Sequence, residues 1–215
     1  MALFACSGGG TDNTAPAQSA PPITASGTSG SSHAFVSDAW GFHIDKPRGW
    51  TLRRDFQSSY LANSAWKTFA APGSRGEPVL SLAVPGSNHI TDAEIRIGAS
   101  RDAAEVQRCT APPSATRADS VATQRINGVS FTTFEAADAA MSHYLTVHAR
   151  RVVHGGTCYA IDMMVFGANP EVYDPPATPP FSNAHAFDAM RAVAGTFGFE
   201  QNPDQPAASA STAAR

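Results

Sequence analysis

The chain has 215 residues and a formal net charge of −3. Its 15 lysine and arginine residues are scattered, so the charge pattern argues against a nucleic-acid-binding surface. No apolar run approaches the roughly 18 residues that a membrane-spanning helix needs. Both ends are depleted of large apolar side chains, so we expect a single domain at residues 34–199 and a disordered tail at 200–215.

The chain begins with Leu3, Phe4, Ala5 and Cys6, followed by serine and glycine residues. This start resembles the lipobox of bacterial lipoproteins, in which a small residue precedes the cysteine that becomes the acylated N-terminus. The resemblance implies that residues 1–6 are the remnant of a signal peptide whose true start lies upstream, and that Cys6 is lipidated. The alternative is an accidental cysteine in a disordered N-terminus.

Residues 7–33 consist almost entirely of Gly, Ser, Thr, Ala and Pro, which offer nothing to bury. A flexible coil of this length has a root-mean-square reach of about 30 Å. It predicts a disordered tether that holds the domain clear of a membrane to which the acyl chains attach. We therefore expect a lipid-anchored protein on the periplasmic face of a bacterial membrane.

The domain is expected to open with two short strands. Phe42 and Ile44 alternate with polar residues, which predicts a strand that ends at Pro47, and a second strand begins at Trp50. With Gly41, these residues form the arrangement GF-x-I-x-x-P-x-GW, which resembles the start of the Mog1/PsbP-like domains of small bacterial lipoproteins. The resemblance implies an α+β fold, a predominantly antiparallel β-sheet with helices packed on it, and a non-catalytic role.

Further strands are expected along the middle of the chain. Residues 64–69 and 78–84 are rich in strand-forming residues, and residues 90–100 favour a strand by their alternation, although a pair typical of a capping box begins that segment. Asn127 and Gly128 are typical of a tight hairpin turn. They predict a hairpin whose strands cover residues 120–126 and 129–136.

Two helices are expected. Asp102 is a typical N-cap, and it predicts a short helix that carries Cys109 and ends before Pro112. Near the end of the chain, Ser182 or Asn183 caps a second helix. Its apolar residues recur at helical spacing and form one stripe: Phe187, Met190, Val193, Ala194 and Phe197.

Residues 142–167 predict a central hairpin. Gly155 and Gly156 accept the positive φ angles of a tight turn, and this turn places Val153 opposite Cys158. Apolar side chains then occupy both faces, which indicates a hairpin covered on both sides. One face carries Leu145, Val147, Val153, Cys158, Met164 and Phe166, and the other carries Tyr144, Val152, Tyr159, Ile161, Met163 and Val165.

Cys109 and Cys158 predict a disulfide, because an exported protein with three cysteines would use Cys6 for lipidation and the remaining two for a bridge. The bond would close a loop of roughly 50 residues and stabilise the fold by about 4 kcal/mol in the chain-entropy model. The alternative is two buried free thiols.

Three histidines and one carboxylate are candidate site residues. His143 and His148 point to opposite faces of a strand, and His154 lies far from both, so we expect no metal site. Asp162 lies diagonal to Arg151 in the hairpin, which favours a buried ion pair over a tuned acid in a cleft. Neither a G-x-S-x-G motif nor a phosphate-binding loop is present, and we expect no catalytic residue and no cofactor.

Residues 169–180 predict a proline-rich loop that could contact a partner through Tyr173, Pro175 and Pro176, because prolines reduce the ordering entropy lost on binding. The alternative is a surface loop stiffened by proline. Together these features predict a non-catalytic cell-envelope lipoprotein that acts as an accessory or interaction module with an envelope protein partner. The alternatives are an envelope hydrolase with a dispersed site at Asp162 and His148, and a carrier of a small apolar ligand.

Overall fold

The structure, a computed structural model, describes residues 33–200. The expected signal remnant, the lipidation site Cys6 and nearly all of the tether and tail lie outside the described residues. The elements follow in the order β1 (His33–Ser37), β2 (Phe42–Lys46), β3 (Thr51–Arg53), β4 (Glu77–Ala83), β5 (Thr91–Ser100), α1 (Ala103–Gln107), η1 (Ala118–Ser120), β6 (Ala122–Ile126), β7 (Val129–Ala140), β8 (His143–His154), β9 (Thr157–Ala168), η2 (Pro170–Val172), α2 (Asn183–Ala194) and β10 (Gly198–Phe199).

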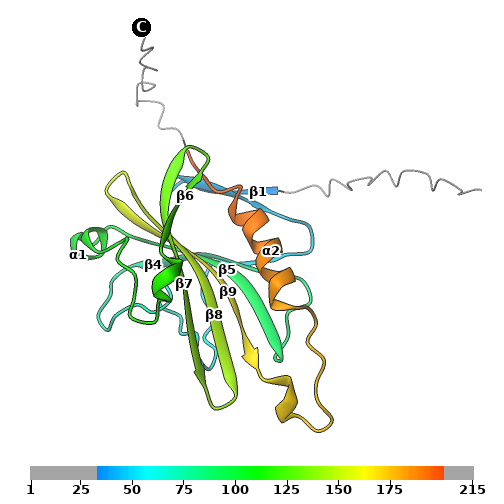
Figure 1. Cartoon of the computed structure of the whole chain (residues 1–215). Helices are drawn as coiled ribbons and strands as arrows, with labels where there is room; N and C mark the ends of the chain where they lie inside the picture. Colours follow the sequence, from blue (N-terminus) through cyan, green and yellow to red (C-terminus); the bar gives the residue numbers. More distant parts are fainter. Residues whose placement is uncertain (1–32, 201–215) are drawn as a thin grey trace, which may run out of the picture.

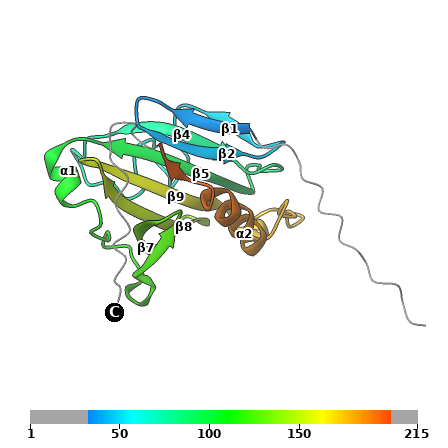
Figure 2. The ribbon, with the colours of Figure 1, turned by 90° about the horizontal axis from the view of Figure 1, so that it is seen from above.

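A seven-stranded sheet forms the body of the domain, in the order β3-β4-β5-β9-β8-β7-β6 (Figure 1). Its neighbouring strands all pair antiparallel. A smaller sheet, β1-β2-β10, lies over β4 and β5, and α2 lies beside β8 and β9 (Figure 2). The expected α+β class with a predominantly antiparallel sheet is confirmed.

The central hairpin has the register that the sequence predicts. Val153 pairs with Cys158 and Leu145 pairs with Phe166, and the turn residues Gly155 and Gly156 both have positive φ. Because β9 lies between β5 and β8, every residue of this strand is buried or nearly so. The hairpin is therefore the middle of the sheet and is covered on both faces, as expected.

One face of the sheet packs against α2 and the small sheet through an apolar core. Ser182 caps α2, because its hydroxyl accepts a hydrogen bond from the amide of His185. Phe42 of β2 stacks on Phe197 beyond α2, with ring centroids 5.1 Å apart, and so joins the small sheet to the helix. The predicted apolar stripe of α2 is buried in this core: Phe187, Met190, Val193, Ala194 and Phe197.

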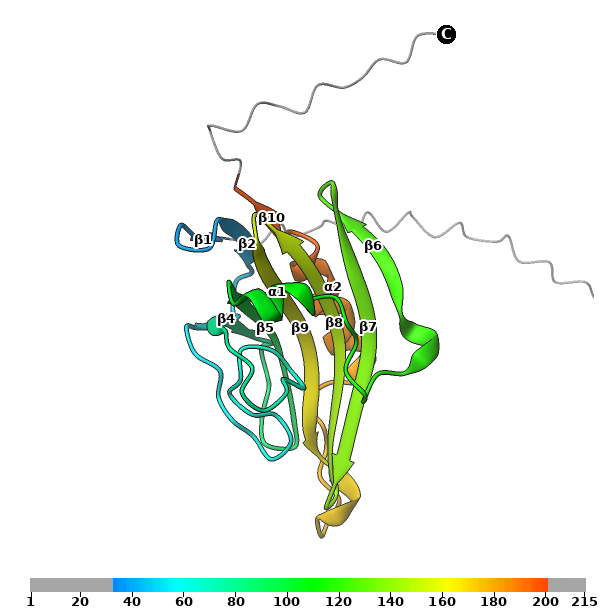
Figure 3. The ribbon, with the colours of Figure 1, turned by 90° about the vertical axis from the view of Figure 1, so that its left-hand side faces the viewer.

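Residues 54–76, which we call the covering segment, and α1 cover the other face (Figure 3). The strand expected at residues 64–69 is wrong, because this segment crosses the sheet without joining it. Trp66 lies against Gly98 of β5, and the indole Nε1 donates a hydrogen bond to the hydroxyl of Ser74 at 2.9 Å. Such side-chain bonds replace the backbone ladder of a strand.

Other boundaries differ from expectation for local reasons. Asp102 caps α1 as predicted, but the helix ends at Gln107, so Cys109 lies in the turn that follows. The hairpin at Asn127 is confirmed, whereas β7 continues to Ala140 and enters β8 through a two-residue turn. The turn residues are Met141 and Ser142, so no glycine indicates this turn in the sequence.

The C-terminal end of the described domain, in β10, lies near the β8–β9 turn at one end of the large sheet, where Phe199 stacks on His154 (Figures 1 and 3). His33 lies at the other end of β2, where it pairs with Lys46. The β7–β8 turn and the loop between β9 and α2 lie at the opposite end of the large sheet. The C-terminal end of the domain is therefore remote from the surface described next.

Candidate functional site

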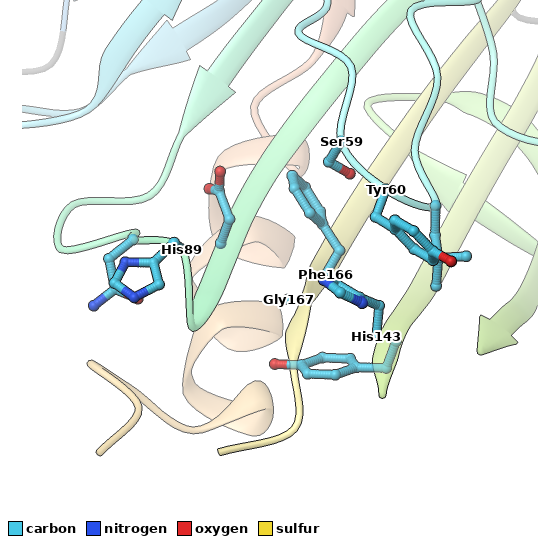
Figure 4. A pocket seen from close by; sticks show the side chains of 10 residues that line it. Ser59, Tyr60, His89, His143, Phe166 and Gly167 are labelled. Carbon is cyan, nitrogen blue, oxygen red and sulfur yellow. The ribbon is translucent and has the colours of Figure 1, made fainter. Parts of the chain in front are cut away.

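A surface pocket of about 250 Å³ lies at the end of the sheet that is remote from β10. We call it the aromatic pocket. Figure 4 shows that its walls come from segments far apart in sequence, with His89 on the β4–β5 turn, Tyr60 on the covering segment and Phe166 on β9. The lining residues are Ser59, Tyr60, Leu61, Asn88, His89, Asp92, His143, Tyr144, Phe166 and Gly167.

Backbone hydrogen bonds hold these segments together. The amide of Asn169 donates to the carbonyl of Ser142 at 2.7 Å, and the amide of Ala168 donates to the carbonyl of Ile90 at 3.1 Å. A Cβ atom at Gly167 would lie 2.0 Å from the carbonyl oxygen of Ile90, so this close approach requires glycine. The pocket floor is therefore fixed by the ends of three strands.

The aromatic side chains of the pocket contact one another and the proline-rich loop. Tyr60 is 58% exposed and stacks on His143, with ring centroids 4.3 Å apart. The Nδ1 atom of His143 donates to the carbonyl of Met141 at 3.0 Å. The ring of His89 meets the ring of Tyr173 edge-on at 6.3 Å. The loop at residues 169–180 thus adjoins the pocket.

Of the three residues singled out in this loop, Tyr173 is half-buried, whereas Pro175 and Pro176 are exposed. Exposed apolar side chains also gather around the pocket: Met141 is 81% exposed and Val172 is 54% exposed. Each lies in a segment that the backbone bonds above join to the pocket. Exposed apolar groups gathered in this way are typical of a contact surface.

The charged side chains of the four segments that form the aromatic pocket are of one sign. The segments at residues 57–63, 85–92, 137–144 and 167–181 meet at this end of the sheet and contain neither lysine nor arginine. Their acidic residues are Asp92, Asp138, Glu171 and Asp174. This end of the domain therefore attracts basic groups.

The predicted disulfide lies on the face that carries α1, near the other end of the sheet. Cys109 and Cys158 are bonded and buried, and they join the turn after α1 to the beginning of β9. This prediction is confirmed. The bond lies on a different part of the domain from the aromatic pocket and its role is to hold a short helix against the sheet.

Arg151 and Asp162 form a buried pair under the covering segment. Nη1 of Arg151 donates to Oδ1 of Asp162 at 2.6 Å, and both side chains are at most 3% exposed. Oδ2 of Asp162 accepts hydrogen bonds from the amide and the hydroxyl of Thr68, at 2.8 and 2.9 Å. Because these bonds engage both carboxylate oxygens, the pair anchors the covering segment to the sheet.

Two more charge pairs extend this anchor. Arg96 donates to Glu94 at 2.7 Å, and its guanidinium also donates to backbone carbonyls of the covering segment. Burial raises the pKa of Glu94, and Arg96 offsets only part of that effect. Lys67 donates to Glu105 at 2.6 Å; burial would raise the pKa of Glu105, but the bond from Lys67 and other nearby donors lower it below its ordinary value.

His148 and Asp162 lie on opposite faces of the sheet. His148 pairs with Met163, the neighbour of Asp162 on β9, and its ring stacks on Phe187 of α2 at 3.8 Å. The two candidate catalytic residues therefore do not share a pocket. His154 stacks on Phe199, away from the other two histidines.

Within residues 33–200, no three His, Cys, Asp or Glu side chains gather as metal ligands would. None of the helices in the same range combines the length and the apolar character that crossing a bilayer requires.

The sequence pointed to the 169–180 loop but missed Tyr60, His89 and Asp92. These residues lie on separate segments, and no local pattern links them. The one available signal was the absence of lysine and arginine from each of the four segments that meet here.

No known family model and no curated protein sequence matches the chain. Among solved structures, it is similar to a crystal structure from Bacteroides thetaiotaomicron VPI-5482 at 14% identity and a TM-score of 0.39, over 80% of this chain and 50% of that one. The chain thus spans half the length of that protein. It is also similar to the solution structure of cyanobacterial PsbP (CyanoP) from Synechocystis sp. PCC 6803, at 11% identity and a TM-score of 0.41, over 79% of this chain and 93% of that one. These likenesses are remote, and the fold assignment rests on the strand order and register above.

Proposed function

We propose that the protein is a non-catalytic cell-envelope lipoprotein that binds a partner protein through the aromatic pocket and the adjoining 169–180 loop. The observation that carries this proposal is the gathering of exposed apolar side chains at one end of the sheet. Tyr60, Met141 and Val172 are more than half exposed, and each adjoins the pocket or its rim. Aromatic and aliphatic groups of this kind supply most of the affinity of protein interfaces.

The chemistry of the surface defines the partner. A pocket of about 250 Å³ accepts one large side chain rather than a whole drug-sized ligand. The surrounding acidic residues, with neither lysine nor arginine among the four segments, favour a basic contact. The partner segment therefore presents an aromatic or branched aliphatic side chain, flanked by lysine or arginine.

The lipid anchor is part of this proposal. Lipidated Cys6 would hold the domain at the membrane through the tether, which joins the domain at His33, beside Lys46 of β2. Mass spectrometry of the native protein tests this premise, because an unmodified Cys6 would remove the anchor.

A photo-crosslinking experiment in cells tests the interaction itself. A benzophenone amino acid replaces Tyr60 in the full-length protein, and a matched variant carries it at Val153, an exposed position near the end of β8. We expect a crosslink to one defined partner from position 60 and none from position 153. Equal crosslinking from both positions, or none from position 60, would contradict the proposal.

A peptide array tests the chemistry of the partner. We expect the purified protein to select peptides that carry an aromatic or aliphatic residue beside lysine or arginine, and raised salt to weaken the binding. Tyr60→Ala should abolish selection, whereas Val153→Ala should leave it unchanged. Selection of acidic or purely polar peptides would contradict the charge argument.

The two alternative functions have less support. A hydrolase site at Asp162 and His148 requires side chains that converge, and these lie on opposite faces of the sheet. A carrier of an apolar ligand requires an enclosed cavity of several hundred Å³. The aromatic pocket has about 250 Å³ and lies at the surface with Tyr60 exposed at its wall.

A further inference from the structure

A second cavity, of about 200 Å³, lies between α2 and the β6–β7 edge of the large sheet. It is on the sheet face opposite Asp162 and at a distance along the sheet from the aromatic pocket. We call it the arginine cavity, after the two arginines among its lining residues. The residues that matter here are Gln124, Thr133, Glu135, His148, Arg150 and Arg191.

Arg150 is the unusual member of this group. It lies on β8, between Thr133 of β7 and Ile161 of β9, and is 3% exposed. Its Nη1 atom is buried and has no hydrogen-bond partner, and no carboxylate of residues 33–200 forms an ion pair with it. A buried guanidinium without a partner is costly, because its desolvation is not offset.

The fold pairs its other deeply buried arginines. Arg96 and Arg151, each 3% exposed, donate to Glu94 and Asp162 on the opposite face of the same sheet. Arg150 has the same degree of burial and the same central position but lacks such a carboxylate. The contrast indicates that the partner of Arg150 is not part of the chain described here.

The charges that face the cavity are positive in balance. Burial and the nearby Arg191 lower the pKa of Arg150 to about 10, so the guanidinium remains charged at neutral pH. The one carboxylate in the cavity lining, Glu135, is already bound by Arg117 at 2.9 Å and lies 3.8 Å from His148. Arg150 therefore keeps an unbalanced positive charge at the cavity wall.

We propose that the arginine cavity binds a small organic anion whose carboxylate pairs with the guanidinium of Arg150, which lines the cavity. A carboxylate matches the planar guanidinium and carries one negative charge. A doubly charged phosphate would be opposed by Glu135, which lines the same cavity. Gln124 and Thr133 place an amide and a hydroxyl in the cavity lining, where they can contact polar groups on the remainder of the anion.

Titration of the full-length protein with acetate and with succinate tests this proposal. Sodium phosphate and sodium chloride serve as comparisons at constant ionic strength. We expect either carboxylate to shift the arginine side-chain NMR signal of Arg150 in a saturable manner and to raise the thermal midpoint. Absence of a saturable shift, or an equal response to chloride, would overturn the proposal. Tighter binding of phosphate would overturn the assignment to carboxylates.

Substitution of Arg150 separates binding from a structural role. Arg150→Met should weaken carboxylate binding by roughly tenfold or more, because a charge-assisted hydrogen bond is lost. Without anion, this variant should unfold at an equal or higher temperature than the wild type, since a costly buried charge is gone. A lower unfolding temperature would instead assign Arg150 a structural role and overturn the proposal.

Two control variants complete the experiment. Arg125→Gln removes an exposed arginine from β6 and should leave carboxylate binding unchanged. Arg151→Met leaves Asp162 buried without its partner and should lower the unfolding temperature, which contrasts with the effect expected at Arg150. If Arg150→Met does not fold, this outcome also assigns Arg150 a structural role and overturns the proposal, as a lower unfolding temperature would.

Discussion

Gly98 is the point at which the covering segment touches the sheet most closely. A Cβ atom at this position would lie 1.7 Å from the carbonyl oxygen of Trp66, and one at Gly76 would lie 2.3 Å from the indole ring. Both glycines are required by space rather than by backbone conformation. Trp66, which is 2% exposed, can therefore lie flat over β5 and seal this face.

We expect Gly98→Ala to lower the free energy of unfolding by about 2–3 kcal/mol, because the added methyl group displaces the backbone at Trp66. Urea unfolding measures the change. Gly195→Ala is a matched control, since Gly195 has an ordinary helical φ of −72° and follows α2. Its effect should stay within about 1 kcal/mol. An equal loss in both variants would contradict the close-contact explanation.

The pH dependence of stability can be assigned in part to His148. Burial between the sheet and Phe187 lowers the pKa of His148, and Arg191, Arg117 and Arg150 act in the same direction, while Glu135 opposes them. The folded-state pKa is thus below the unfolded value of 6.5. The contribution to stability is present above pH 6.5 and is lost as pH falls through the folded-state pKa.

His148→Phe preserves the stack on Phe187 and removes the titrating group. We expect the wild type to lose more stability than this variant between pH 7.5 and pH 5. Denaturant unfolding at both pH values gives the difference directly. Identical pH slopes in the two proteins would show that His148 is not a source of this dependence.

At the scale of elements, α1 depends on its connections. A helix of five residues, Ala103–Gln107, is too short to persist without tertiary contacts. Its connections are the Cys109–Cys158 bond at its end and the bond from Lys67 to Glu105 on the helix itself. We therefore expect the disulfide to be needed to keep α1 packed on the sheet.

Replacing both cysteines, Cys109→Ala with Cys158→Ala, should lower the free energy of unfolding by about 2–4 kcal/mol, because the unfolded chain regains the freedom of a loop of 49 residues. Unfolding with and without dithiothreitol measures the effect. The reductant should destabilise the wild type and leave the double variant unchanged. A wild type that is insensitive to reductant after complete reduction would contradict the prediction.

Elements set by neighbouring residues could be predicted from the sequence. The turns at Asn127 and Gly155 follow from residues that tolerate positive φ, and the alternation beside them sets the register of the hairpins. The strand predicted at residues 64–69 is wrong, and β10 was not predicted, for the opposite reason. Residues 64–69 are held by hydrogen bonds to Ser74, Glu105 and Asp162, and β10 pairs with β2, which is distant from it in sequence.

The candidate site follows the same division. The 169–180 loop carried a local signal in its prolines, whereas Tyr60 and His89 reach the aromatic pocket through the path of distant segments. Arg150 had no signal at all. In sequence it is one of two adjacent arginines. Only the alternation of side chains across β8 separates Arg151, which pairs with Asp162, from Arg150, which has no carboxylate partner among residues 33–200.

For the molecule as a whole, the two faces of the large sheet are covered by different kinds of contact. The face under α2 and the small sheet is joined by one large apolar core, whereas two smaller apolar clusters and buried charge pairs together hold the covering segment on the other face. The two proposed binding surfaces occupy separate regions, the aromatic pocket at one end and the arginine cavity on the α2 face. Occupation of one need not block the other.

The antiparallel pairing of both β1 and β10 with β2 allows the domain to be circularly permuted. His33 pairs with Lys46, and the amide of Glu200 donates to the carbonyl of Gly41. The first and last residues of the described domain therefore both flank β2. They lie roughly 17 Å apart along this strand, at about 3.3 Å per residue. A linker of about eight residues would bridge them. A circular permutant joined in this way and opened at the exposed Gly155 turn should fold, and its disulfide would then link the two new arms of the chain.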